Sequence, residues 1–251
     1  MRRIAGVALI VALSPCVLPA IAGAQQWPPQ RLQNLKVLPA DIPIRTLIDT
    51  MAGFTRALGV RCTYCHVGSE GADLSTYDFV SDSLAGKRKA REMLRMVSAI
   101  NHDFLAKVPE RREPPIVVGC ATCHHGIAQP RPLQQVLLTA YDASGVDSAE
   151  AAYRALRARY YGSAAYDFGE VPLADVAGSV RARDKLADAL RLYRLNIEFS
   201  PRSTFALRQA AGAELAAHDT AAAIADFEKA LAINPNDTQS QRALEGLRRK
   251  P

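Results

Sequence analysis

Apolar residues in the first half of the chain recur at spacings of three and four residues, which places their side chains on one face of an α-helix. One such run ends at Gly59, and glycine commonly closes helices because it accepts positive φ. The pattern predicts an amphipathic helix over about 44–58, with these residues on its apolar face: Ile44, Leu47, Ile48, Met51, Phe54 and Leu58.

A second run of this kind predicts a helix over about 87–107. Its apolar face holds Met93, Met96, Val97, Ile100 and Phe104. The polar segment between the two helices, about 67–86, contains glycine and serine and predicts a loop. Residues 25–43 are rich in proline and predict an extended lead-in.

The last third of the chain contains a repeat with a period of 34 residues. Three positions of one copy, Ala189, Tyr193 and Pro201, recur as Ala223, Phe227 and Pro235, and Ala230, Leu207 and Ala211 occupy further diagnostic positions. The pattern resembles the tetratricopeptide repeat. It predicts a complete copy over about 204–233, an earlier copy that contributes mainly its second helix, and a capping helix over 238–250. A plain alanine-rich helical hairpin is the alternative. So few repeats bury little core alone, and we expect them to dock on the rest of the chain or on another subunit.

These patterns predict an all-α protein. A stretch with glycine and proline over 126–132 predicts the start of a linker, and helical patterns follow over about 148–160 and 172–180. The predicted division is a signal peptide (1–24), the extended lead-in (25–43), a dihaem domain argued below (44–132), a linker with connecting helices (133–183) and the tetratricopeptide-like domain (184–251).

The amino terminus carries the three parts of a secretory signal. Arg2 and Arg3 precede an apolar run over 4–13, and Ala22-Gly23-Ala24 supplies the small residues of a cleavage site after Ala24. A membrane anchor is disfavoured because Pro15 and Pro19 interrupt a short apolar stretch. We therefore expect a periplasmic or extracellular protein with no transmembrane span after cleavage.

Cleavage also removes Cys16. The presence of this cysteine leaves open the alternative that the protein is a lipoprotein. The four cysteines that remain form two motifs, Cys62-Thr63-Tyr64-Cys65-His66 and Cys120-Ala121-Thr122-Cys123-His124. Cys-x-x-Cys-His is the attachment motif of haem c, in which both thiols bond to the haem and the histidine is the proximal iron ligand. A redox dithiol, a disulfide or a zinc site is the alternative, but none of them requires a histidine after each pair. The sequence therefore predicts two haem c groups.

Methionines are the candidate sixth ligands of the two irons. Met51, Met93 and Met96 are the methionines that remain after the signal, and all three fall on the predicted helices that precede the motifs. A methionine on an apolar helix face is usually core filler. Their concentration here favours ligation by Met51 at the first haem and by Met93, with Met96 as the alternative, at the second. A thioether ligand raises the potential, as in electron-transfer cytochromes.

At these residues the chain resembles the tetrahaem cytochrome subunit of photosynthetic reaction centres. The shared motifs are Met51-Ala52-Gly53-Phe54-Thr55 before the first Cys-x-x-Cys-His, then Ala90-Arg91-Glu92-Met93-Leu94-Arg95-Met96 with Ala99-Ile100-Asn101 before the second. The likeness covers about 35–132, one two-haem half of that subunit. It implies methionine axial ligands at Met51 and Met93. His125 stands where the family usually has arginine, and the carboxyl-terminal repeat is foreign to the family.

Composition and charge narrow the classes of function. The chain has 251 residues, 49% of them hydrophobic, and a formal charge of +6. Loss of the signal lowers this charge to +4, which equals the excess of eight basic over four acidic residues between Lys87 and Glu113. Some of these cations are expected to pair with haem propionates or to steer an acidic partner, and a solvated helix face is the alternative. Aromatic residues are few and no basic block is longer than Lys87-Arg88-Lys89, so nucleic acid is not an expected partner and stays only a weak alternative.

The leading hypothesis is an exported electron carrier rather than an enzyme. Its expected partner is a redox protein or a membrane electron-transfer complex, and its repeat would serve docking or self-association. One alternative is a dihaem peroxidase or reductase with one open iron and His102 as a distal acid or base. The other is a subunit of a haem-bearing filament.

Overall fold

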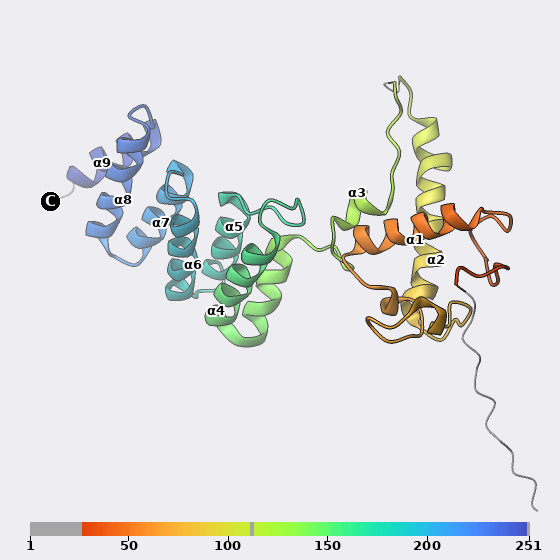
Figure 1. The fold of residues 1–251 in the computed structure, drawn as a ribbon. Coiled ribbons are helices and arrows are strands. Elements are labelled where there is room, and N and C mark those ends of the chain that lie inside the picture. The colour runs from red at the N-terminus through yellow and green to blue at the C-terminus, as the bar shows by residue number, and fades with distance from the viewer. Residues whose placement is uncertain (1–26, 111–112, 250–251) are drawn as a thin grey trace, which may run out of the picture.

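The computed structural model describes residues 27–110 and 113–249 (Figure 1). Regular structure within these ranges is helical apart from one isolated bridge between Val67 and Asp78, so the predicted all-α class is confirmed. The predicted signal over 1–24 lies outside the described residues. The helices are α1 (Ile44–Leu58), α2 (Ala85–Ala99), α3 (Cys120–His124), α4 (Leu133–Tyr160), α5 (Glu170–Arg181), α6 (Leu186–Phe199), α7 (Thr204–Ala216), α8 (Thr220–Ile233) and α9 (Thr238–Arg248).

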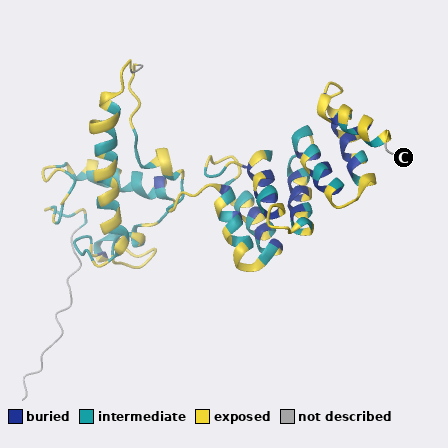
Figure 2. Cartoon of the chain, turned by 180° about the vertical axis from the view of Figure 1, so that it is seen from behind, coloured by how far each residue is buried: buried dark blue, intermediate teal, exposed yellow. Residues whose placement is uncertain are grey.

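The helices form two groups that differ in how they are buried. Figure 1 shows α1, α2 and α3 in one part and α4 to α9 stacked one after another in the other, joined by the connection between α3 and α4. Buried residues concentrate in the stack (Figure 2). Between 27 and 132, the buried hydrophobic residues that the structure describes are Ala57 and Tyr77. No helix in the described ranges has the length and apolarity that a membrane crossing needs.

The end of α1 joins the two cysteine motifs. α1 ends at Gly59, as the sequence pattern predicts, with a φ of 63° that favours glycine. A Cβ on Gly59 would lie 2.0 Å from the carbonyl oxygen of Gly126. The Gly126 N–H donates to the carbonyl of Ala57 at 2.8 Å. Because Gly126 lies two residues after the second motif, this close backbone contact fixes α3 against the end of α1.

The path of α2 continues through a π-helical turn over Ile100–Phe104 and a 3₁₀ turn over Leu105–Lys107, which together match the predicted helix. Within the π turn, the Asn101 side chain donates to the Val118 carbonyl at 2.8 Å and accepts from the Val118 N–H at 2.9 Å. These two bonds tie the segment that leads into the second motif to the end of the helix.

The stack has the predicted 34-residue period, and its repeat begins earlier in the chain than predicted. α5, α7 and α9 begin at residues 170, 204 and 238, and α6 and α8 begin at 186 and 220. The earlier copy therefore has both of its helices, α5 and α6, which corrects the prediction that it contributes mainly its second helix. The missed signal was Leu173 and Ala177, which lie 34 residues before Leu207 and Ala211, and all four are buried.

Residues 133–183, predicted as a linker with connecting helices, pack into the stack. Leu137 and Tyr153 of α4 share one hydrophobic core with Leu173 of α5 and Leu192 of α6. A bend at Ser144 and Gly145 inside α4 turns both of its segments onto this core. The predicted boundary at 183/184 falls in the turn between α5 and α6 and would divide the first repeat. The connection outside the helices is the shorter stretch 125–132.

Candidate haem sites

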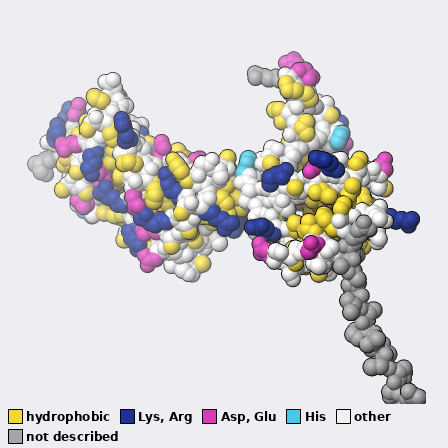
Figure 3. Space-filling view, viewed as in Figure 1, with side chains coloured by type: hydrophobic (Ala, Val, Ile, Leu, Met, Phe, Trp, Pro, Cys, Tyr) yellow, Lys and Arg dark blue, Asp and Glu magenta, His cyan; other side chains and the backbone are white. Residues whose placement is uncertain are grey.

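The apolar face of α1 lines a cavity of about 740 Å³. Met51 from this face, and Cys62, Cys65 and His66 of the first motif, all line the same cavity. Its volume lies within the range of cofactor and ligand sites. Figure 3 shows hydrophobic side chains gathered on this face of the molecule. The structure thus brings the predicted proximal histidine, the predicted sixth ligand and both thiols of the first motif to one apolar site.

The imidazole of His66 is in the neutral form that binds metals. Burial, followed by the positive charge of Lys87, lowers the pKa of His66 to about 4. Its ring packs edge-on against Phe79, with the ring centroids 4.9 Å apart. The buried Nδ1 atom has no hydrogen-bond partner among the described residues.

The cysteines of both motifs are free thiols. In the first motif, the His66 N–H donates to the carbonyl of Cys62 at 2.9 Å, which holds the histidine next to the thiol pair in a tight turn. Burial raises the pKa of the Cys65 thiol, and the neighbouring Cys62 adds to this effect. None of the four cysteines is held in a disulfide, so their thiols are available for covalent haem attachment.

The two faces of α2 have different surroundings. Lys87, Ala90, Arg91 and Leu94 line the cavity beside His66. Met93 does not line this cavity, and 40% of its surface is exposed, while Met96 is 45% exposed. The two predicted candidates for the second iron therefore lie away from the first motif.

The second motif forms the short helix α3, which is capped by a bond from the Gly119 N–H to the hydroxyl of Thr122 at 3.0 Å. The Nδ1 atom of His124 lies 2.9 Å from the carbonyl oxygen of Ile127. Because a carbonyl can only accept, Nδ1 donates this bond and leaves Nε2 as the nitrogen available to a metal, which is the usual arrangement of a metal-binding histidine. The adjoining His125 is exposed and has a positive φ of 47°.

Apolar side chains are exposed along the path that leads into the second motif. The segments before it, α2 with the turns that continue it and the connection to α3, expose these large hydrophobic residues: Met93, Met96, Phe104, Val108, Ile116 and Val117. The flat apolar faces of a porphyrin match such a surface. The free thiols, the oriented His124 and this surface fit a haem at the second motif, as the cavity and His66 fit a haem at the first.

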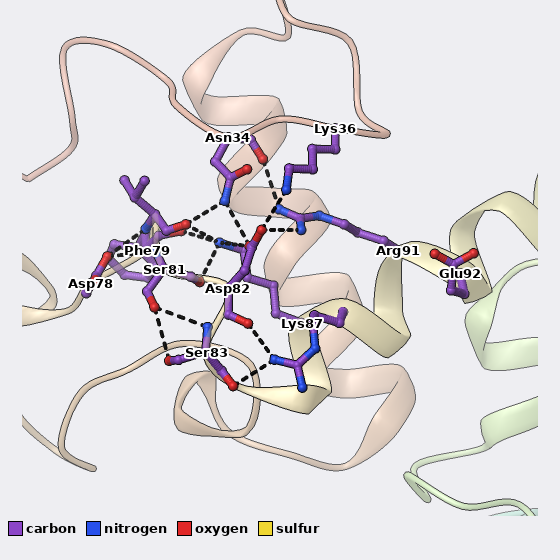
Figure 4. A network of polar contacts seen from close by, with 12 residues as sticks. Asn34, Lys36, Asp78, Phe79, Ser81, Asp82, Ser83, Lys87, Arg91 and Glu92 are labelled. Atoms are coloured by element: carbon purple, nitrogen blue, oxygen red, sulfur yellow. Dashed lines mark hydrogen bonds and ion pairs between the residues drawn. The ribbon is translucent and has the colours of Figure 1, made fainter.

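The main site residue that the sequence analysis missed is Asp82 (Figure 4). Its carboxylate accepts from Lys36 and Asn34 at 2.8 Å and pairs with Arg91 at 2.8 Å and with Lys87 at 3.3 Å. The hydrogen bond from Arg91, followed by that from Lys36, holds the pKa of Asp82 far below its ordinary value. The available signal was a lone acidic residue just before a strongly basic helix start.

This network engages part of the excess of basic residues between Lys87 and Glu113, called the basic strip from here on. Lys87 also donates to the carbonyls of Phe79, Val80 and Ser81, and it is largely buried together with Arg91. Arg95 pairs with Glu92. Much of the strip's charge is therefore engaged within the chain rather than presented to a partner.

A helical fold with two Cys-x-x-Cys-His motifs whose cysteines are free thiols, the first of them at an apolar cavity, defines a c-type cytochrome domain. The sequence model of the photosynthetic reaction centre cytochrome C subunit family matches residues 10–163. The chain belongs to this family, and membership implies covalently bound haem c.

Other similarities cover smaller parts. Cytochrome c-554 of Chloroflexus aurantiacus is 39% identical over 69 residues, which is 28% of this chain and 14% of that protein. Two solved structures, the first tetratricopeptide domain of Spaghetti (RPAP3) bound to an HSP90 peptide and the NMR structure of the first such domain of human RPAP3, are similar to 46% of the chain. Each is 20% identical, is 87% covered and has a TM-score of 0.32. The tetratricopeptide-like character of the stack rests instead on the 34-residue spacing of its helices.

Proposed function

We propose that the protein is an exported dihaem c-type cytochrome that carries single electrons. Each bound haem would supply an iron that takes up one electron and releases it again. The observation that carries the proposal is the cavity in which Met51 and His66 lie together with both thiols of the first motif.

Each residue has a role in this proposal. Cys62 and Cys65 would hold the first haem and Cys120 and Cys123 the second. His66 and Met51 would ligate the first iron, and His124 and Met93, with Met96 as the alternative to Met93, the second. Burial of the first site and thioether ligation both favour a raised reduction potential.

The proposed partner is a redox protein or a membrane electron-transfer complex, met in the periplasm or outside the cell. Family membership supports such a partner. The family match covers residues 10–163 and so includes α4, but the repeat of α5 to α9 lies outside it. We assign it to docking on this partner or to self-association.

Haem counting tests the proposal. Protein purified from a host that attaches haem c is expected to carry two haems per chain, both low-spin. Replacing Cys62 and Cys65 by alanine should remove one haem, and replacing Cys120 and Cys123 should remove the other. A haem-to-protein ratio of one, or high-spin signals from both irons in the parent protein, would overturn it.

A second candidate function, a dihaem peroxidase or reductase, is favoured by one observation at the second motif. Met93 and Met96 are exposed rather than packed in a cavity, so an open iron would occur here rather than beside Met51. His102, the residue suggested as acid or base, is exposed and its Nδ1 lies 2.8 Å from the Ser98 carbonyl. Carbon monoxide binding to one haem without displacement of a ligand, together with peroxide turnover, would establish this function.

A further inference from the structure

The lead-in over 27–38 crosses the first haem site without regular structure. Side chains along its whole length line the cavity, including Trp27, Leu32, Leu35 and Leu38. The segment, called the strap from here on, therefore forms part of the wall of the cavity that Cys62, Cys65 and His66 also line. A wall without internal helical or sheet bonds depends on its contacts with the rest of the fold.

The contacts that hold the strap converge on one loop and one carboxylate (Figure 4). Trp27 packs on Phe79, with ring centroids 4.9 Å apart. The Asn34 side chain donates to the Val80 carbonyl at 2.5 Å and to Asp82 at 2.8 Å. Lys36 donates to Asp82 at 2.8 Å.

Asp82 also connects the strap to α2. Its Oδ2 atom lies 2.8 Å from both Lys36 on the strap and Arg91 on α2. Arg91 in turn donates to the backbone carbonyl of Asn34 at 3.1 Å. Lys87 and Arg91 both line the cavity. One carboxylate thus joins the strap, the loop and the helix around the site.

We infer that Asp82 is a positioning residue of the first haem site, which holds the strap closed over the cavity and so limits the access of water to the haem. The inference rests on the proposed function. The α2 side of this network is more protected than a surface ion pair, because only 12% of the Lys87 side chain and 13% of the Arg91 side chain are exposed, against 55% of Lys36 on the strap. Charge-assisted bonds in such surroundings are stronger than bonds at an open surface.

Closure and charge affect the potential of the first haem in opposite directions. Water stabilises the more positive ferric state, so an open strap lowers the reduction potential. Removal of a nearby negative charge destabilises the ferric state and raises it. A variant that opens the strap without changing charge therefore separates the two effects, and Asn34 offers one. Its φ of 61° is a conformation that glycine accepts, so Asn34→Gly removes the side chain at no steric cost to the backbone.

The experiment compares the parent protein, Asp82→Asn, Asn34→Gly and the control Glu92→Gln by hydrogen exchange and by redox titration. Glu92→Gln removes one carboxylate from α2 that pairs with Arg95 and not with the strap. We expect amides of residues 27–38 to exchange about tenfold faster in Asp82→Asn and Asn34→Gly. Exchange in α1 should stay unchanged, as should all exchange in Glu92→Gln. Asn34→Gly should also lower the potential of the first haem and leave the second unchanged.

Two results would overturn the inference: strap exchange in Asp82→Asn within twofold of that in Glu92→Gln, or faster exchange in Asn34→Gly with an unchanged potential of the first haem. If Asp82→Asn does not fold, Asn34→Gly decides by the same two readouts. A parent protein without haem would refute the proposed function instead, and the exchange comparison would still show whether Asp82 holds the strap.

Discussion

Asp82 is the residue on which the charges beside the first haem site converge. It is ionised well below the ordinary range of a carboxyl because Arg91 and Lys36 bind the carboxylate. A carboxyl whose pKa is lower in the folded than in the unfolded chain stabilises the fold above its unfolded pKa of about 3.9. That stability is lost as the pH falls toward the folded pKa.

Asp82→Asn should therefore destabilise the cytochrome part by an amount that is constant above about pH 5 and shrinks below about pH 4. The measurement is urea unfolding at several pH values, followed by the haem absorbance. Glu92→Gln is the control and should show little destabilisation at any pH, because both partners of its ion pair are exposed. A destabilisation by Asp82→Asn that grows in acid would contradict the expected sign.

Met93 and Met96 lie three residues apart on α2 with similar exposure, so exposure does not distinguish them. We expect Met93→Ala to convert one of two low-spin haem signals to high spin and to lower that haem's potential, because the thioether ligand is lost. Met96→Ala should leave both signals low-spin, and Met51→Ala should affect the other haem. Electron paramagnetic resonance combined with redox titration makes the comparison. A high-spin signal in Met96→Ala alone would exchange the two roles.

Among the helices, α1 contributes to both candidate haem sites, because one of its faces lines the cavity at the first motif and its end contacts α3. Gly59→Ala places a Cβ 2.0 Å from the Gly126 carbonyl oxygen at a φ of 63°. We expect a loss of about 1–3 kcal/mol of stability and an altered spectrum of the second haem. Gly53→Ala in the same helix is the matched control, because its Cβ meets nothing within 4 Å. It should gain up to about 1 kcal/mol. Equal effects of the two changes would refute the role of the contact.

Sequence pattern predicted the elements whose determinants are local. The end of α1 at Gly59 and the thiol and histidine spacing follow from neighbouring residues. Local sequence marks Asp82 only as an acidic residue before a basic helix start and does not reveal its role, because its contact with Asn34 joins residues 48 positions apart. The first helix of the earlier repeat was recognisable from Leu173 and Ala177. Recognising it required a comparison with the equivalent positions of α7, which lie 34 residues later in the chain. The different surroundings of the two faces of α2 also had to come from the structure, because sequence periodicity predicts which residues share a face but not what that face contacts.

At the scale of the whole molecule, the two parts have separate sources of stability. Both hydrophobic cores among the described residues lie within α4 to α9, whereas the apolar face of α1 in the cytochrome part lines the cavity at the first motif. A loss of packing in the stack should therefore not reach the irons.

Leu207→Ala tests this separation. Leu207 is buried in α7, and its truncation should lower the stability of the stack by about 2–5 kcal/mol. Both haem potentials and both spectra should stay unchanged. Helical circular dichroism follows the stack during urea unfolding, and haem absorbance follows the cytochrome part. Two separate transitions are expected, and Leu207→Ala should shift only the transition of the stack to lower urea concentration. Ile233→Ala, at a position with 37% exposure, is the control and should have a smaller effect. If Leu207→Ala shifts a haem potential, the stack must contact the haem part in solution, and the repeat would act on electron transfer rather than only on docking.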